Sequence, residues 1–307
     1  MSNISIKDFL NSLPKNEKIY YKTNPGNAGD ALIATGAYQL FKKCNLNITS
    51  ISSPDFDATN KVVIYAGGGN LVGIYPEARQ FFENNHKKAK QLIMLPHTVT
   101  KNEDLLKTLG SNVTIFAREQ VSYNHLLDHA KNANVYIDHD LAVYLNAHAI
   151  INSQSIGFLK ALILKVTYRL LNNTRAKEIP SISIMMRNSI FELNSLFLKS
   201  KDTGIFFRDD VESLNFEVPK SNADLSKVYD YGTHSEEVTY YTTQRLMRYI
   251  NHFTNIRTDR LHICIAAALL DKPVEFYPNS YFKCKAVYEY SLKDKFPNIQ
   301  WVNKTNQ

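Results

Sequence analysis

The chain has 307 residues, 44% hydrophobic and 21% charged, which is typical of a globular protein with room for two domains. Its N-terminus has no basic stretch followed by an apolar one, and no apolar run approaches the roughly 20 residues that span a bilayer, so we expect neither a signal peptide nor a transmembrane helix. The three cysteines form no CxxC pair, so we expect a cytoplasmic protein without a disulfide framework or a structural zinc site. The net charge is +7, but nothing resembles a zinc finger, an RNA-recognition signature or a basic zipper, so we expect no nucleic-acid partner.

The first half of the sequence alternates between predicted strands and predicted helices. Runs typical of buried strands lie at 18–23, 61–70, 92–97, the start of 112–131 and 134–142, and helical spacing lies at 31–44, 78–91 and the end of 112–131. Strands that alternate with helices predict a mostly parallel sheet covered on both faces. We assign residues 1–150 to an N-terminal α/β domain.

The alternation stops in residues 151–180 and then resumes. That stretch is helical at its centre and rich in Ser and Asn at its ends, and we interpret it as a basic helical linker. Predicted strands follow at 181–187, 204–210, 253–258 and 273–278, and predicted helices at 234–251 and 259–270. We therefore expect a C-terminal α/β domain over 181–307. The predicted fold is α/β, with two Rossmann-like domains and a cleft between them.

Two glycine-containing segments follow predicted strands. "NPGNAGDALI" places Asn27 and Asp30 before a helix, where Asp30 is either a helix cap or part of an anion site. "AGGGN" places Gly68, Gly69 and Asn70 after a buried strand, and we expect a ligand or another backbone segment to approach closely there. Neither segment matches GxxxxGK[ST] or GxGxxG, so no nucleotide fingerprint is present.

Arginines follow several apolar strands. Arg118, Arg187, Arg208 and Arg260 each lie at such a position, and His97 follows another strand. If these arginines converge, they suit a ligand that carries carboxylate and phosphate, because the guanidinium group matches either anion. The alternatives are an ion pair of Arg118 with its neighbour Glu119 and a structural role for His97.

"RTDRLHICIAAALL" combines a polar start with a buried helix. Thr258 or Asp259 is a good N-cap, so Arg260 and His262 are expected in the first turn, pointing out of the apolar body. A helix N-terminus favours anions, and histidine can move protons near neutral pH. Alternatively, Arg260 pairs with Asp259 and His262 only fills space.

Residues 157–177 read as a basic amphipathic segment. Most of the positive excess lies in residues 151–200, which hold seven basic and two acidic residues. Such a segment can lie on an anionic membrane, and we expect peripheral contact with the inner face of the cell membrane. The alternative is an interdomain helix that packs its apolar side on the core.

The motifs together resemble the polysaccharide pyruvyl transferase family over nearly the whole chain. "NAGDALIATGA", "GGGNL", "LPHTV", "FAREQVSY" and "DHDLAVYL" occur in the order found in the family, and "TDRLHICIAAALLDKPVEFYPNSYFKCKAVYEY" resembles its most specific part. The resemblance implies a fold similar to GT-B glycosyltransferases. It also implies transfer of a pyruvyl group from phosphoenolpyruvate to a sugar of a bacterial-type surface polysaccharide or its precursor, as a cyclic ketal, without a cofactor or metal ion. The acceptor could be lipid-linked.

The resemblance also assigns roles. Arg260 would bind the anionic donor, His262 would transfer protons, and Arg187 would be a second anion clamp. His97, which replaces a glutamine of many members, either adds an acid/base group or only exchanges one hydrogen-bonding residue for another. The remaining candidates for substrate binding are Arg118, Asn27, Asp30, Gly68, Gly69, Asn70, Asn279, Ser280 and Lys283.

Two other functions stay open from the sequence. A GT-B-like protein could transfer a sugar from a nucleotide sugar, although no acidic ribose ligand is evident. A degenerate member could bind glycans as a non-catalytic assembly factor, although the retention of Arg260 and His262 argues against it.

Overall fold

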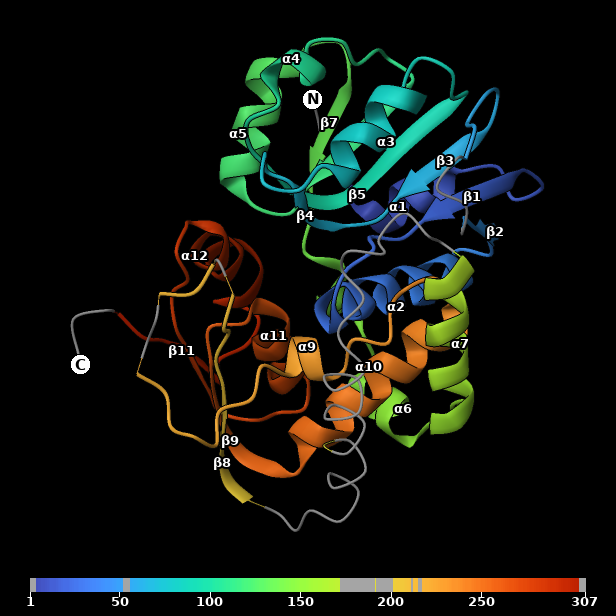
Figure 1. Ribbon diagram of the computed structural model, residues 1–307. Coiled ribbons are helices and arrows are strands. Elements are labelled where there is room, and N and C mark those ends of the chain that lie inside the picture. The colour runs from blue at the N-terminus through green and yellow to red at the C-terminus, as the bar shows by residue number, and fades with distance from the viewer. Residues whose placement is uncertain are drawn as a thin grey trace. The chain divides into compact units, whose positions relative to one another are not determined.

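The computed structural model describes residues 4–51, 56–171, 191, 201–210, 212–214 and 217–303. Contacts within the chain group it into two compact units (Figure 1). Unit 1 comprises Met1–Pro25, Ile33–Leu145 and Ala286–Ser291, and unit 2 comprises Gly26–Leu32, Asn146–Lys285 and Leu292–Gln307. The domain boundaries inferred from the sequence, and the cleft, stay predictions.

Unit 1 is built on a parallel sheet of seven strands. The strands are β1 (Lys18–Lys22), β2 (Asn47–Ser50), β3 (Val62–Tyr65), β4 (Gly68–Leu71), β5 (Gln91–Val99), β6 (Val113–Ala117) and β7 (Asn134–Ile137). They are ordered β2-β1-β3-β5-β6-β7, with β4 paired to β5. All residues of β3 and β6 are buried, as expected for strands covered on both faces. The strand order reverses its direction after β2, because β3 lies on the other side of β1 from β2. In doubly wound sheets, ligands bind at the carboxyl ends of the strands where the order reverses.

Most helices of unit 1 lie between its strands in the sequence, whereas α1 (Ile6–Ser12) precedes β1 and a 3₁₀ turn, Leu141–Tyr144, follows β7. The helices between strands are α2 (Ala28–Lys43), α3 (Glu77–Asn85), α4 (Glu103–Leu106) and α5 (Gln120–His129). Residues 26–32, which include the first turn of α2, belong to unit 2. One apolar core of the unit packs side chains of β3, β5 and β6 against those of α3 and α5.

Unit 2 contains a parallel sheet of four strands. Its strands are β8 (Lys201–Phe206), β9 (Phe253–Thr258), β10 (Val274–Phe276) and β11 (Ile299–Trp301), in the order β11-β10-β9-β8. The remaining helices among the described residues are α6 (Ala147–Asn152), α7 (Phe158–Leu171), α9 (Leu225–Val228), α10 (Glu236–Asn251), α11 (Leu261–Leu269), α12 (Lys283–Val287) and a π-helical turn, Tyr288–Leu292. In α11, all positions from Ile263 to Ala268 are buried, so this short helix is a core element on every side.

The predicted α/β class with parallel sheets is confirmed, and single elements differ from their predicted bounds. The predicted strand 253–258 coincides with β9, whereas the predicted strand 61–70 is two strands, β3 and β4. Residues 66 and 67 separate the two strands, and Gly68, the first residue of β4, has a φ of 138°, a backbone conformation that favours glycine. The predicted strand 181–187 lies outside the described residues. None of the described helices combines the length and hydrophobicity needed to cross a bilayer.

Candidate functional site

The two glycine-containing segments approach each other at the carboxyl ends of β1 and β3. Asn24 Nδ2 donates a hydrogen bond of 2.7 Å to the carbonyl oxygen of Gly67. A Cβ atom on Gly67 would lie 2.8 Å from the carbonyl oxygen of Pro96, so another backbone segment requires glycine at this position. Of the two alternatives drawn from "AGGGN", the structure thus supports close backbone approach at Gly67. Gly68, Gly69 and Asn70 continue into β4.

His97 is fully buried in β5, and both of its ring nitrogens are hydrogen-bonded. Nε2 accepts from the backbone N–H of Asn70 at 3.0 Å, so Nδ1, 3.1 Å from the Ala66 carbonyl oxygen, carries the proton. Burial, and then the charge of Arg118, lowers the pKa of His97 to about 3. A neutral imidazole with both nitrogens occupied has no capacity for proton transfer here. The geometry favours the second interpretation of His97, a hydrogen-bonding residue in place of glutamine.

Arg118, at the end of β6, is 1% exposed and forms a buried ion pair. Its Nη1 lies 2.7 Å from Asp140 Oδ2, and its Nε donates to Thr98 Oγ1 at 2.9 Å. The alternative of an ion pair with Glu119 is wrong, although Glu119 does cap a helix: it accepts from the backbone N–H of Ser122 at the start of α5. The "FAR" and "DLA" motifs are therefore joined by one ion pair, which holds Arg118 within the fold.

The "NPGNAGD" segment forms a reciprocal cap at the start of α2. Asn27 Oδ1 accepts from the Gly29 N–H at 2.8 Å, and Asp30 Oδ2 accepts from the Asn27 N–H at 3.1 Å. A Cβ atom on Gly26 would lie 1.8 Å from Asp30 Oδ2, so Gly26 leaves room for this carboxylate. The helix-cap interpretation of Asp30 is confirmed.

His262 lies directly against this cap, within unit 2. A Cβ atom on Gly29 would be 2.6 Å from His262 Nδ1. His262 is half-buried and is the second residue of α11, so its imidazole lies at the first turn of both α2 and α11. The N-terminal end of a helix carries partial positive charge and backbone N–H donors, which favour an anion. This arrangement can hold an anionic group beside a side chain that moves protons.

Arg260 is bound by two carboxylates. Its Nε lies 3.0 Å from Asp224 Oδ1 and its Nη2 lies 2.8 Å from Asp210 Oδ2. Arg260 is the N-cap residue of α11 and is only 7% exposed, so the expected first-turn position is wrong, and so is the alternative of a pair with Asp259. The reason is that β8 and the start of α9 bring two carboxylates to the end of β9.

Glu212 contacts the three candidate residues from the last family motif, Asn279, Ser280 and Lys283. Its carboxylate accepts from Lys283 Nζ at 2.8 Å and from Asn279 Nδ2 at 3.4 Å, and it also pairs with Arg208. The carbonyl oxygen of Glu212 accepts from the Ser280 N–H at 3.0 Å. Burial would raise the pKa of Glu212, but Lys283 and Arg208 outweigh burial and bring the pKa to about 2. Sequence reasoning missed Glu212 and Asp224, because a carboxylate outside a motif gives no signal of its partners.

Asp259 is a further buried carboxylate at the end of β9. It is 0% exposed, and its Oδ1 accepts from the backbone N–H of Arg208 at 2.8 Å. Its Oδ2 has no hydrogen-bond partner among the described residues. Burial raises the pKa of Asp259 to about 6. Asp259 therefore titrates near neutral pH, which the sequence did not predict.

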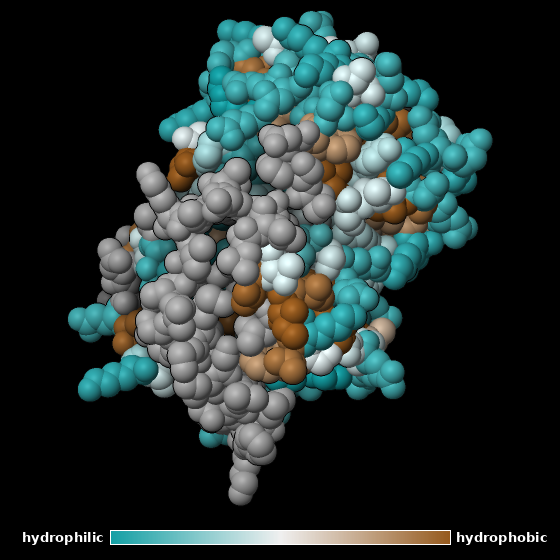
Figure 2. All heavy atoms as spheres, turned by 45° about the vertical axis from the view of Figure 1, so that its right-hand side comes forward, coloured by the Kyte–Doolittle hydropathy of each residue, from teal (hydrophilic) through white to brown (hydrophobic). Residues whose placement is uncertain are grey.

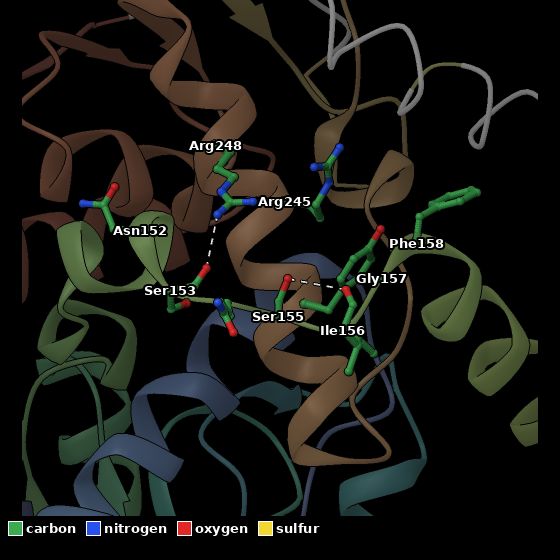
Figure 3. A pocket seen from close by; sticks show the side chains of 10 residues that line it. Asn152, Ser153, Ser155, Ile156, Gly157, Phe158, Arg245 and Arg248 are labelled. Atoms are coloured by element: carbon green, nitrogen blue, oxygen red, sulfur yellow. Dashed lines mark hydrogen bonds between the residues drawn. The ribbon is translucent and has the colours of Figure 1, made fainter.

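A separate pocket in unit 2 contains none of the predicted site residues. This cavity of about 570 Å³ lies between α10 and the segment that leads from α6 into α7. Figure 3 shows Arg248 of α10 directed at Ser153, whose carbonyl oxygen accepts from Arg248 Nη2 at 3.2 Å. Arg245 and Tyr241 also line the pocket. Its polar groups suit an anionic or hydroxylated ligand. Arg187, a predicted anion clamp, lies outside the described residues.

Comparisons with known proteins agree with this arrangement of motifs. The model of a family described as polysaccharide pyruvyl transferase matches residues 27–281. EpsO of Bacillus subtilis (strain 168), whose name describes a pyruvyl transferase, is 24% identical over 331 aligned positions, covering 100% of this chain and 96% of EpsO. The crystal structure of a functionally uncharacterized protein from Klebsiella pneumoniae subsp. pneumoniae NTUH-K2044 is similar with a TM-score of 0.73 and 26% identity, covering 97% of this chain and 96% of that one. Because the family match spans most of the sequence, the protein belongs to the polysaccharide pyruvyl transferase family.

Proposed function

We propose that this protein transfers the enolpyruvyl group of phosphoenolpyruvate to a sugar of a surface polysaccharide or its precursor and forms a pyruvate ketal. Family membership supports pyruvyl transfer to a polysaccharide acceptor. The observation that carries the proposal is the position of His262 at the first turns of α2 and α11. Phosphoenolpyruvate offers a phosphate and a carboxylate for helix N-termini and a methylene carbon that must be protonated.

The chemistry requires three proton transfers, and we assign two of them to His262. Protonation of the methylene carbon makes the adjacent carbon electrophilic, and one sugar hydroxyl attacks it and loses its proton. Phosphate then leaves with the electron pair of the broken C–O bond, and a second hydroxyl closes the ketal and loses its proton. We assign His262 as the group that donates the first proton and accepts one from a hydroxyl. Backbone N–H groups at the two helix ends would stabilise the departing phosphate.

Arg260 takes a different role in this proposal from the one its motif suggests. Its guanidinium group is already engaged by Asp210 and Asp224, so we assign it as a positioning residue that fixes the start of α11 and hence His262. Lys283 is likewise engaged by Glu212. Arg187 as a second anion clamp stays a proposal that rests on the sequence.

Thermal stability in the presence of candidate donors tests the proposal. A ligand at about 100 times its dissociation constant stabilises the folded state by about 2.7 kcal/mol. We expect phosphoenolpyruvate to raise the melting temperature and UDP-sugars to raise it less or not at all, and we expect mass spectrometry to detect pyruvate ketals on the cell's surface glycan only when the protein is present. Stabilisation by a UDP-sugar without an effect of phosphoenolpyruvate would favour sugar transfer instead.

Peripheral membrane contact through α7 is a second proposal for a lipid-linked acceptor, placed on the cytoplasmic side. Leu159, Ile163 and Val166 are 67%, 56% and 37% exposed, and their spacing puts them along one face of α7. Figure 2 turns this side of the molecule forward and shows hydrophobic surface there. Lys160 lies 3.1 Å from Glu237, which reduces its attraction to anionic lipid. Of the predicted basic face, Arg175 and Lys177 lie outside the described residues.

Sedimentation with anionic liposomes at low salt tests the membrane proposal. Changing Leu159 and Ile163 to glutamine should reduce binding, because it removes apolar surface that would enter the lipid. The matched control changes Val121 and Leu127 of α5, which are 46% and 44% exposed, to glutamine. Equal binding by both double variants would refute the role of α7.

A further inference from the structure

A group of metal-ligating side chains occurs where α4 begins and α5 ends in unit 1. Glu103 is the first residue of α4, and His125 and His129 lie one turn apart on α5, so both imidazoles share a face. The ligand atoms of these three residues all lie within 4.8 Å of one another, and the two imidazole centroids are 4.6 Å apart. The ranges covered by the structure contain no second group of three or more such side chains.

The backbone turn before α4 brings oxygen atoms to His125. His125 Nε2 is 2.9 Å from the carbonyl oxygen of Lys101 and 4.0 Å from Glu103 Oε1. Lys101 and Asn102 both have left-handed backbone conformations, with φ of 55° and 61°. The Asn102 side chain anchors this turn by donating to the Thr100 carbonyl oxygen at 3.0 Å. The turn therefore holds Glu103 and a backbone carbonyl on the same side of α5 as the imidazoles.

This set of ligands selects one class of metal ion. Imidazole nitrogens and a carboxylate are ligands of Zn²⁺, whereas Mg²⁺ and Ca²⁺ prefer oxygen atoms alone. A tetrahedral Zn²⁺ at about 2.0–2.2 Å from each ligand requires ligand atoms roughly 3.3–3.6 Å apart. The Glu103 side chain is 45% exposed and can rotate to close the remaining gap to His125. Water or the Lys101 carbonyl oxygen would supply the fourth ligand.

We propose that Glu103, His125 and His129 form a binding site for Zn²⁺ that joins the start of α4 to the last turns of α5. The ion would cross-link residues that are 22 and 26 positions apart, with its three ligands supplied by the folded chain. Because the unfolded chain does not hold these ligands together, binding should stabilise the fold. The site is separate from the residues assigned to pyruvyl transfer, so its role is structural, and no step of that reaction depends on it.

Titration calorimetry on tag-free protein tests the site, with ZnCl₂ as the probe and MgCl₂ as the comparison. We expect one Zn²⁺ per chain with a micromolar dissociation constant, a higher melting temperature with Zn²⁺ and no change with Mg²⁺. His129→Ala and Glu103→Gln should each weaken binding at least tenfold. Both residues are at least partly exposed, so neither substitution should prevent folding.

The matched control is His148→Ala. His148 is 65% exposed on α6 and lies 3.4 Å from Asp271, the one carboxylate that pairs with it within the described ranges. This variant should bind Zn²⁺ like the parent. The proposal is overturned if the parent shows no saturable binding at one equivalent, or if His129→Ala and Glu103→Gln bind as tightly as His148→Ala does. Co²⁺ in place of Zn²⁺ gives an independent readout, since tetrahedral coordination produces intense visible absorption that His129→Ala should lose.

Discussion

The strand ends of unit 1 and those of unit 2 place a histidine in opposite surroundings. His97, in unit 1, is 0% exposed and has both nitrogens hydrogen-bonded, whereas His262, in unit 2, is half-buried at the first turns of two helices. His97 lies near the carboxyl end of β5 and His262 follows β9, each in a motif of the family, so their sequence positions look alike. The difference teaches that a position near a strand end brings a residue to the carboxyl edge of a sheet, and that burial then decides whether a ligand can reach it.

The buried arginines of the two units differ in a similar way. Arg118 forms a buried ion pair with the carboxylate of Asp140. Arg260 meets two carboxylates, those of Asp210 and Asp224, within a larger charged network. Three of the four arginines that seemed suited to an anionic substrate are thus engaged by the protein's own carboxylates, and the fourth, Arg187, lies outside the described residues.

The sharpest test of this comparison substitutes glutamine for each histidine. His262→Gln should lower turnover by about 10²–10⁴-fold with little change in melting temperature, because glutamine keeps a hydrogen-bonding shape without transferring protons. His97→Gln should retain activity within a few-fold, because an amide can both donate to the Ala66 carbonyl and accept from the Asn70 N–H. Steady-state rates and melting curves measure both effects. Equal losses of turnover would show that the two histidines are not distinguished as we describe.

Buried charge pairing predicts the largest loss of stability. Arg118→Met should reduce the free energy of unfolding by about 3–5 kcal/mol, because it leaves the Asp140 carboxylate buried without its cation. The same substitution at Arg257, whose pair with Glu275 is 49% and 35% exposed, should cost only about 0–1 kcal/mol. Urea denaturation measures both values. A small effect at both positions would contradict a structural role for the Arg118 pair.

The pH dependence of stability should reveal Asp259. Its pKa is raised from 3.8 to about 6 in the fold, so between these values the native state keeps a proton that the unfolded chain has lost. The contribution of Asp259 to the free energy of unfolding therefore falls by up to about 3 kcal/mol as pH rises from about 4 to 6. Asp259→Asn removes the charged form and should stabilise the protein at pH 8 but hardly at pH 4.

Urea denaturation of parent and Asp259→Asn at both pH values isolates this group. Glu212 and Asp210 have lowered pKa values of about 2, so their contributions are lost as pH falls, but they are common to both proteins. Asp202→Asn is the matched control, since Asp202 is exposed. The same change in stability for both variants at pH 8 would refute a buried carboxyl group with a raised pKa at position 259.

The smallest expected effect on turnover comes from adding one methyl group at Gly29. Gly29→Ala places a Cβ atom 2.6 Å from His262 Nδ1, so the imidazole must move, and we expect at least a tenfold loss of turnover. The free energy of unfolding should change little, because alanine favours a helix by about 1 kcal/mol over glycine and this offsets the cost of moving the imidazole. Gly157→Ala, with no atom within 4 Å of the new Cβ, should behave like the parent. Full activity of Gly29→Ala would separate His262 from catalysis.

The sequence by itself determined the α/β class, the order of most strands and helices, and the motifs that carry the family resemblance. These follow from local rules, because buried parallel strands need continuous apolar runs and helix starts need capping groups such as Asn27 and Asp30. The sequence also drew attention to His262 and Arg260, since each stands at the polar start of an apolar helix.

The tertiary structure alone decided which charged groups are engaged with one another. Arg260 lies 36 residues from Asp224 and 50 from Asp210, and Arg118 lies 22 from Asp140, so no local pattern connects them. The position of His262 against Gly29 likewise depends on a contact between distant segments. Periodicity reports which face of an element is buried, whereas the partner of a buried charge is set by how the chain brings strand ends together.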